Sequence, residues 1–309
     1  MQGLLSFPLT PFTARDHGGT VHEAAFVEHL ERQIAAGPSA IFVGCGTGEY
    51  SSLTPAEQER VIHVAVRVAA GRLPVYAGAG GGAGSARAAV RAAADAGADG
   101  VLLLPPYLVS GGSDGLLDHV RFAVRDSPIP AIVYQRATAL FTPRTAVELL
   151  EIKEIRGLKD GVGDVDLMQR IVSAIRSSEH PRAQGFGFFN GLPTAELSQP
   201  AYRAIGVPAY SSAVHCFAPE ITHAFARALD SGDVATIQLL TTAFFSPLAA
   251  LRDSHPGYAV SIVKAGARLA GLDAGPVRPP LVDLSEGHLE QLRRILADGR
   301  RALAQIRAH

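Results

Sequence analysis

The sequence predicts an α/β protein that folds as a (β/α)8 TIM barrel with a C-terminal helical extension. Three observations carry this prediction. Eight short apolar runs recur along the chain, a stretch with helical patterning follows each run, and about 75 residues with helical patterning remain after the last barrel unit. The chain has 309 residues, whereas a typical barrel has roughly 250, so there is room for added helices.

The eight apolar runs are the predicted strands of the barrel. Each is apolar on both alternations, as expected for parallel strands that helices cover on one face and that pack together on the other. Because strands and helices alternate with no sign of a reversal in order, closure into a barrel is favoured over an open sheet. The runs are residues 3–9, 40–46, 74–80, 100–106, 130–135, 155–160, 185–191 and 208–214.

Signals for helix starts lie between these runs. Thr20 with Glu23, and Thr54 with Glu57, have the spacing of capping boxes, and Pro55 occupies the favoured first position of a helix. After the eighth run, three helical stretches are expected at residues 233–252, 259–270 and 286–307. The chain therefore divides into two expected domains, a barrel of residues 1–231 and a three-helix extension of residues 232–309 that packs on it.

Composition narrows the possible partners and locations. Apolar residues make up 47% of the chain and charged residues 18%, which suits a large buried core. A net charge of −1 offers no electrostatic basis for binding nucleic acid or an anionic membrane. We find no apolar run near the roughly 20 residues that span a bilayer, and no signal-peptide pattern at the N-terminus. Two cysteines provide no disulfide framework, so a cytoplasmic location is expected.

Motifs for metals and nucleotides are absent or poor. The histidines include no H-E-x-x-H pattern, and the cysteines form no C-x-x-C pair. His215 and Cys216 are adjacent, and we interpret them as structural. The run 78–84 loosely fits a dinucleotide fingerprint, but no acidic residue clearly ends a second strand about 20 residues later. We therefore expect no metal and no organic cofactor.

Lys159 is the most informative residue in the sequence, because it ends the sixth apolar run and barrel active sites lie at the C-terminal ends of strands. An ammonium ion there is poorly hydrated, and desolvation favours the neutral amine that attacks a ketone. The alternative is a lysine that extends into solvent or pairs with Asp160. The other two lysines, Lys153 and Lys264, are interpreted as surface or structural residues.

Several other groups at strand ends indicate a binding site. Tyr134 ends the run beside Lys159, where its phenol could relay protons or only line the barrel mouth. Arg136 could pair with a carboxylate or be an ordinary surface arginine. The turn at residues 46–49, Gly-Thr-Gly-Glu, could offer backbone N–H groups to a carboxylate or be a plain connection. The further candidate substrate-binding residues are Thr10, Gly46, Gly48, Tyr107, Gly191, Ser211 and Ser212.

Five motifs in register resemble the dihydrodipicolinate synthase/N-acetylneuraminate lyase superfamily over essentially the whole chain. They are LTPF near the start, then GTGE, LLLPPY, VYQR and GLKD after the second, fourth, fifth and sixth runs. Within the superfamily, AYSSAV and AGPVRPPLVDL are most similar to the 5-dehydro-4-deoxyglucarate dehydratase branch. That resemblance implies a lyase that removes water and CO2 from 5-dehydro-4-deoxy-D-glucarate, giving 2,5-dioxopentanoate.

The resemblance also implies residue roles and an assembly. Lys159 would form an imine, Tyr134 would relay protons, and Thr47 with the turn at Gly46 would contact the carboxylate beside the keto group. No cofactor is implied, and a homodimer or homotetramer is expected.

Two dipeptides depart from the dehydratase pattern. They are Ala137-Thr138, in place of Asp-Asn, and His215-Cys216, in place of Phe-Asn, and they are expected near the far end of the substrate or at the barrel mouth. They keep open an aldolase or lyase of the same superfamily that acts on another 2-keto-3-deoxy acid. The third alternative is a non-catalytic barrel that binds a sugar acid.

Overall fold

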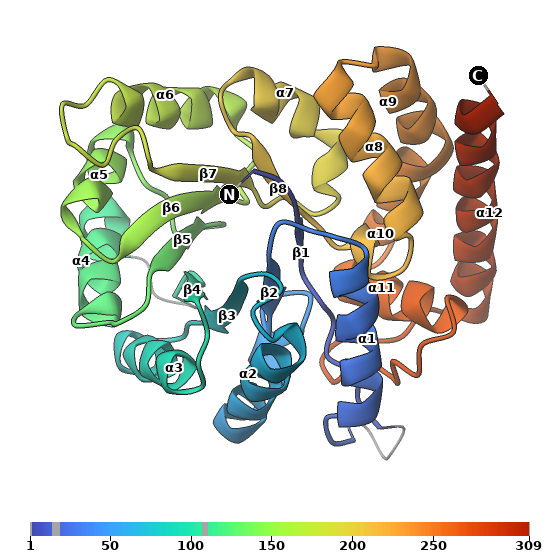
Figure 1. Ribbon diagram of the computed structural model, residues 1–309, viewed down its shortest axis with the longest axis horizontal. Coiled ribbons are helices and arrows are strands. Elements are labelled where there is room, and N and C mark those ends of the chain that lie inside the picture. The colour runs from blue at the N-terminus through green and yellow to red at the C-terminus, as the bar shows by residue number, and fades with distance from the viewer. Residues whose placement is uncertain (1, 14–18, 107–110, 309) are drawn as a thin grey trace.

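The computed structural model describes residues 2–13, 19–106 and 111–308, and it is a closed barrel of eight parallel strands surrounded by helices (Figure 1). The strands follow one another around the barrel in chain order, and β1 closes on β8. Each apolar run contains one strand, so the predicted fold class is confirmed. The strands are β1 Gly3–Ser6, β2 Ile41–Val43, β3 Val75–Ala79, β4 Gly100–Leu103, β5 Ala131–Gln135, β6 Ile155–Asp160, β7 Gly187–Asn190 and β8 Ala209–Ser212.

The helices of the barrel lie on its outside, and four more helices follow the barrel along the chain. In Figure 1 these four, α9 to α12, gather on one side of the barrel next to α8. The barrel helices are α1 Glu23–Ala35, α2 Pro55–Ala69, α3 Ala83–Asp95, α4 Gly112–Val124, α5 Pro143–Glu148, α6 Val165–Arg176, α7 Gln199–Ala204 and α8 Pro219–Ser231. The later helices are α9 Val234–Leu240, α10 Ser246–Asp253, α11 Tyr258–Leu269 and α12 Glu286–Ala308.

One of the two predicted capping boxes is present. The Thr54 side chain accepts the N–H of Glu57 at 3.2 Å, and the Glu57 carboxylate accepts the N–H of Thr54 at 3.0 Å. The box at Thr20 and Glu23 is wrong, because α1 begins at Glu23 and His22 caps it instead. The Glu23 carboxylate pairs with two arginines of α2 and is therefore not available to cap α1.

Aromatic and aliphatic side chains fill the inside of the barrel. Phe7 of the β1 end stacks on Phe42 of β2 at 4.7 Å between ring centroids, and Phe189 of β7 packs on the same ring at 5.8 Å. A second core lies between α8 and the extension, where Phe225 meets Phe245 at 5.2 Å. The extension is thus joined to the barrel by buried apolar surface. The division after residue 231 stays a prediction.

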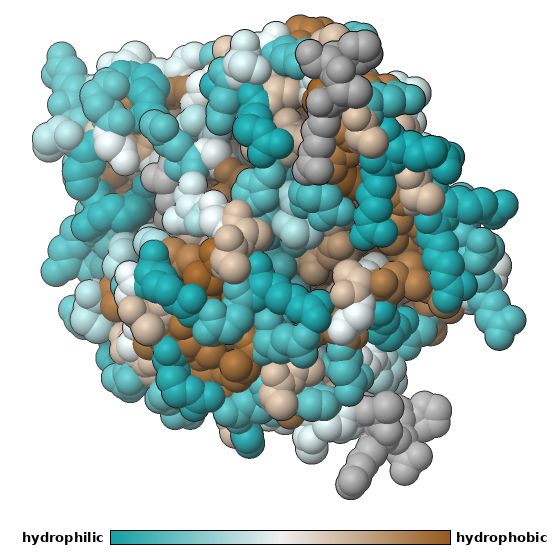
Figure 2. All heavy atoms as spheres, turned by 45° about the vertical axis from the view of Figure 1, so that its right-hand side comes forward, coloured by the Kyte–Doolittle hydropathy of each residue, from teal (hydrophilic) through white to brown (hydrophobic). Residues whose placement is uncertain are grey.

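The helical stretch Val234–Asp253 corrects the expectation that no apolar run is long enough to span a bilayer. It is 20 residues long, and 18 consecutive residues of it have a mean hydropathy of 1.6, so by length and composition it could cross a membrane. In this fold, its large apolar side chains Leu240, Phe244 and Leu248 are buried in the core shared with α8 and α12. Figure 2, which brings the extension side forward, shows hydrophobic residues in patches among hydrophilic ones.

Phe245→Ala tests the packing of the extension on the barrel. Phe245 has no exposed surface and packs edge-on against Phe225 and Phe244, so its loss leaves a cavity in a shared core. We expect the free energy of unfolding in urea to fall by about 3–5 kcal/mol. Val234→Ala, at a position 60% exposed on α9, is the control and should change it little. If both variants lowered the free energy of unfolding by equally small amounts, the packing of the extension would not depend on this core.

Candidate active site

Strand β6 points its last two side chains in opposite directions. Lys159 faces the inside of the barrel, where its Nζ lies near the rings of the inner core, and Asp160 faces outward. The Asp160 carboxylate accepts Gln135 Nε2 at 2.7 Å, the N–H of Gly163 at 3.3 Å, and the Tyr202 hydroxyl. The suggested Lys159–Asp160 pair is therefore not formed.

Aromatic rings surround the Lys159 amine. Its Nζ lies 3.9 Å from the centroid of Phe7, 4.4 Å from that of Tyr134 and 5.7 Å from that of Phe189. Lys159 is 5% exposed, and none of the acidic side chains in the described ranges forms an ion pair with it. Burial, with a smaller contribution from the positive charge of Arg136, lowers the pKa of Lys159 to about 7. A large fraction of the amine is therefore neutral and nucleophilic at neutral pH.

Tyr134 lies directly across from Lys159 in the register of β5 and β6. Its hydroxyl donates a hydrogen bond to the carbonyl oxygen of Gly191 at 3.1 Å. Burial raises the pKa of the phenol, although the nearby Arg136 opposes that shift. The phenol therefore keeps its proton at neutral pH and can donate it to an oxygen bound near the amine.

Gly191 makes room for the amine. A Cβ at this position would lie 2.2 Å from Lys159 Cε, which is far inside van der Waals contact. Gly161 has the same role beside Tyr134, since a Cβ there would lie 2.6 Å from the hydroxyl. Both positions thus require glycine to hold the lysine and the tyrosine in this arrangement.

The amine opens into a cavity of about 360 Å³ that the barrel and the extension form together. Of the residues that the sequence placed at the substrate, the wall contains Lys159, Tyr134, Gly46, Thr47, Arg136, Gly191 and Ser211. The extension closes the other side mainly with apolar residues, among them Leu248, Val260, Ile262, Val263 and Leu281. In the described part of the wall there is no Asp or Glu, so the cavity suits an anion.

Three expected substrate contacts lie behind this wall. Thr10 is buried and donates its hydroxyl hydrogen to the carbonyl oxygen of Gly48 at 2.8 Å. This hydrogen bond supports the turn at residues 46–49. Ser212 is buried and donates to Glu196 Oε1 at 2.5 Å. None of the three lines the cavity, and their contact with a substrate stays a prediction. Tyr107 lies outside the described residues.

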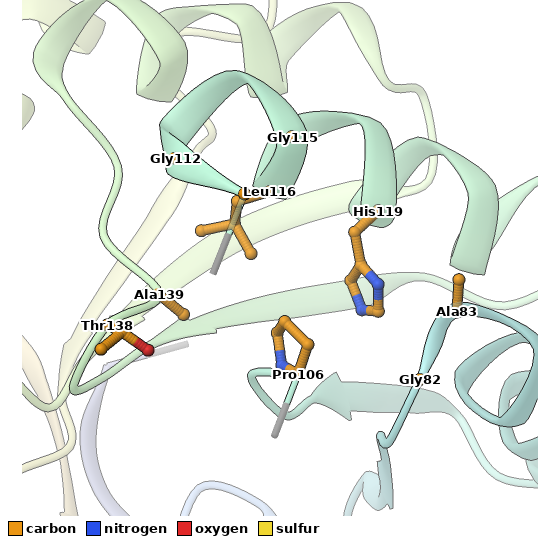
Figure 3. A pocket seen from close by; sticks show the side chains of 10 residues that line it. Gly82, Ala83, Pro106, Gly112, Gly115, Leu116, His119, Thr138 and Ala139 are labelled. Carbon is orange, nitrogen blue, oxygen red and sulfur yellow. The ribbon is translucent and has the colours of Figure 1, made fainter. Parts of the chain in front are cut away.

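The departures from the dehydratase pattern also lie away from the cavity of Lys159. His215 has no exposed surface and its Nδ1 contacts Gln33 Oε1 at 2.6 Å, while Cys216 Sγ donates to the carbonyl oxygen of Phe7 at 3.2 Å. Thr138 lines a separate cavity of about 210 Å³, where it lies beside Ala139 and faces residues of α4 (Figure 3). Ala137 is exposed. None of the four lines the cavity of Lys159, although Ala137 and Thr138 directly follow Arg136, which does. Their place relative to a bound substrate stays a prediction.

Arg252 is a cavity residue that the sequence did not indicate. It comes from α10, and its Nη1 donates to the hydroxyl of Thr194 at 2.7 Å across the wall. Nothing in the sequence marks this arginine among the others of the extension, because its approach to the barrel depends on how α10 packs. In the same described ranges, no group of three or more His, Cys, Asp or Glu gathers to hold a metal ion.

Comparisons with known proteins agree with these features. The dihydrodipicolinate synthetase family matches residues 1–298. A Streptomyces avermitilis protein named "Probable 5-dehydro-4-deoxyglucarate dehydratase 1" is 51% identical over 96% of this chain and 93% of its own length. A Paracidovorax citrulli protein named "Probable 5-dehydro-4-deoxyglucarate dehydratase" is 43% identical over 95% of this chain and 94% of its own length. The crystal structure of dihydrodipicolinate synthase from Bacillus anthracis has a TM-score of 0.85 at 26% identity, covering 96% of this chain and 98% of that one. The resemblance found in the motifs is confirmed.

Gly191→Ala is expected to displace Lys159. Because the added Cβ would overlap Lys159 Cε, adduct formation at this lysine should fall by about 100-fold or more while the barrel stays folded. The measurement is the rate of borohydride trapping of a 2-oxo acid, followed by mass spectrometry. Gly84→Ala, where a Cβ would meet no atom within 4 Å, is the matched control. An unchanged rate in Gly191→Ala would contradict the observed geometry.

The lowered pKa of Lys159 gives a second measurable consequence. The neutral amine is the reactive form, so arylation of Lys159 by 1-fluoro-2,4-dinitrobenzene, a reagent that does not ionise in this pH range, should rise as pH increases through about 7 and level off above it. Peptide mass spectrometry can compare it with Lys153, whose side chain is 85% exposed, in the same sample. Reactivity of Lys159 that appears only above pH 9 would mean that the amine is solvated or paired.

Proposed function

Because the chain belongs to the dihydrodipicolinate synthetase family, we propose that it is a Schiff-base lyase that acts as a 5-dehydro-4-deoxyglucarate dehydratase. It would convert 5-dehydro-4-deoxy-D-glucarate into 2,5-dioxopentanoate, CO2 and water. The buried amine of Lys159, which forms no ion pair with a described acidic residue and lies beside the phenol of Tyr134, is the observation that carries the proposal. The substrate is taken from the relatives of that name, of which one is 51% identical over 96% of this chain.

The proposed reaction begins at the keto group of the substrate. The neutral amine of Lys159 attacks the C5 carbonyl, Tyr134 passes a proton to the oxygen, and loss of water leaves a protonated imine. The imine withdraws electrons, so a proton leaves C4 and the hydroxyl group leaves C3 as water. The C1 carboxylate then departs as CO2, and its bonding electrons enter the conjugated imine. Protonation and hydrolysis of the imine release 2,5-dioxopentanoate and restore the amine.

The charges of the cavity support a substrate with two carboxylates. Arg136 and Arg252 both contribute to the wall, and no acidic side chain opposes them in its described part. The turn at Gly46 and Thr47 also faces the cavity, and we assign its backbone N–H groups to the carboxylate beside the keto group. The protonated imine is itself the electron sink of this route, so the proposal includes no cofactor. A homodimer or homotetramer in the cytoplasm is part of the proposal.

Sodium borohydride trapping with mass spectrometry tests the proposed function. With 5-dehydro-4-deoxyglucarate, we expect a permanent adduct on Lys159 whose mass shows the loss of water and CO2. Lys159→Arg should abolish the adduct, because the guanidinium stays protonated, whereas Lys153→Arg at an exposed position should not. Release of pyruvate in a lactate dehydrogenase assay would show an aldolase instead. The absence of an adduct with any 2-oxo acid would exclude the Schiff-base mechanism.

A further inference from the structure

Glu49, which follows the turn at the cavity wall, is held in an unusual backbone conformation. Its φ is 57° and its ψ is 43°, in the left-handed region that residues with a side chain rarely adopt. Its N–H donates to the carbonyl oxygen of Gly46 at 3.1 Å and thereby closes the turn Gly46–Gly48. A strained residue of this kind persists only where its surroundings hold it in place.

The surroundings that hold Glu49 come from the C-terminal extension. Glu49 Oε1 lies 2.7 Å from Nζ of Lys264 on α11, and both side chains are fully buried. The second oxygen, Oε2, accepts the backbone N–H of Arg278 at 2.9 Å. Neither Glu49 nor Lys264 lines the cavity, so neither contacts a bound substrate. The carboxylate thus connects the turn to the extension from behind.

Lys264 is fixed in turn by its own contacts. Its Nζ donates to the carbonyl oxygen of Pro276 at 2.8 Å and lies 3.9 Å from the centroid of Phe12, at the end of the first barrel segment. Close by, a Cβ at Gly275 would lie 1.7 Å from the Phe12 carbonyl oxygen, so the backbone passes Phe12 in direct contact. The ammonium group of Lys264 is therefore held at one position by three separate segments of the chain.

A buried ion pair of this kind does not by itself stabilise a fold. Removing two charges from water offsets most of their attraction, and an apolar pair of similar volume often does as well. What the pair adds is a fixed geometry, because one carboxylate must meet both an ammonium group and a backbone N–H. The geometry that it fixes here is that of the turn whose N–H groups face the cavity.

We propose that Glu49 and Lys264 are positioning residues that hold the turn Gly46–Gly48 in the orientation that binds the carboxylate of a 2-oxo acid. The inference rests on the proposed function, which assigns this turn to that carboxylate. Without the pair, the imine-forming lysine keeps its own surroundings, because Phe7, Tyr134 and Gly191 touch it independently. Recognition of the carboxylate is lost while the reactivity of the amine is kept.

Two ketones that differ only at the carboxylate separate these effects. Pyruvate carries the carboxylate, and pyruvamide replaces it with a neutral amide of nearly the same shape. In Lys264→Met and Glu49→Gln, we expect the rate of borohydride trapping with pyruvate to fall about 10- to 100-fold. The rate with pyruvamide should change less than about twofold, because the amine is untouched. The ratio of the two rates is therefore the measurement.

Two further variants distinguish positioning from general loss of stability. The double variant Glu49→Gln/Lys264→Met leaves no unpaired charge in the core and should show the same fall in the ratio. Phe245→Ala weakens the extension at a site away from the cavity and should leave the ratio as in the wild type. An unchanged ratio in Lys264→Met and in the double variant would overturn the inference. If the wild type traps neither ketone and also forms no adduct with 5-dehydro-4-deoxyglucarate, the proposed Schiff-base function fails instead.

Discussion

The removal of the Lys159 amine from water is the constraint on which the rest of the structure depends. Burial without an ion pair to a described acidic residue lowers the pKa of Lys159 to about 7, and the neutral form that this favours is a nucleophile. Closure of the eight strands creates the apolar interior, and the rings of Phe7 and Phe189 line it around the amine. Gly191 then leaves the space that the side chain occupies. The closed barrel therefore buries the Lys159 amine, and that burial accounts for the lowered pKa on which the reactivity of the amine depends.

The alternation of side chains along β6 separates two charges that would otherwise neutralise each other. Lys159 and Asp160 are neighbours in the sequence, yet they lie on opposite faces of the strand. Asp160 satisfies its two oxygens with Gln135, Tyr202 and backbone N–H groups behind the barrel wall. If the Asp160 carboxylate faced inward, it would favour the ammonium form of Lys159, which is not nucleophilic. The hydrogen bonds that hold Asp160 outside the barrel therefore also favour the neutral, nucleophilic form of Lys159.

The C-terminal extension completes the cavity, whereas the buried amine of Lys159 comes from the barrel. Its apolar residues close the cavity over the barrel mouth, and Arg252 adds a positive charge at the same wall. Lys264 and the chain near Arg278 reach the back of the turn at Gly46 through Glu49. A barrel alone places functional groups only at the ends of its strands. The added helices bring further groups to positions that those strand ends do not reach.

The sequence by itself determined the barrel, its eight strands and the position of Lys159 at a strand end, because apolar runs and strand ends are local features that depend on neighbouring residues. Motif order along the whole chain was enough to indicate the family. Only the tertiary structure decided which polar groups reach the cavity, since that depends on side-chain direction and on packing between distant segments. Thr10 and Ser212 had the right location along the chain but point behind the wall. Lys264 looked structural because its partner, Glu49, is remote in the sequence and meets it only when α11 packs against the barrel.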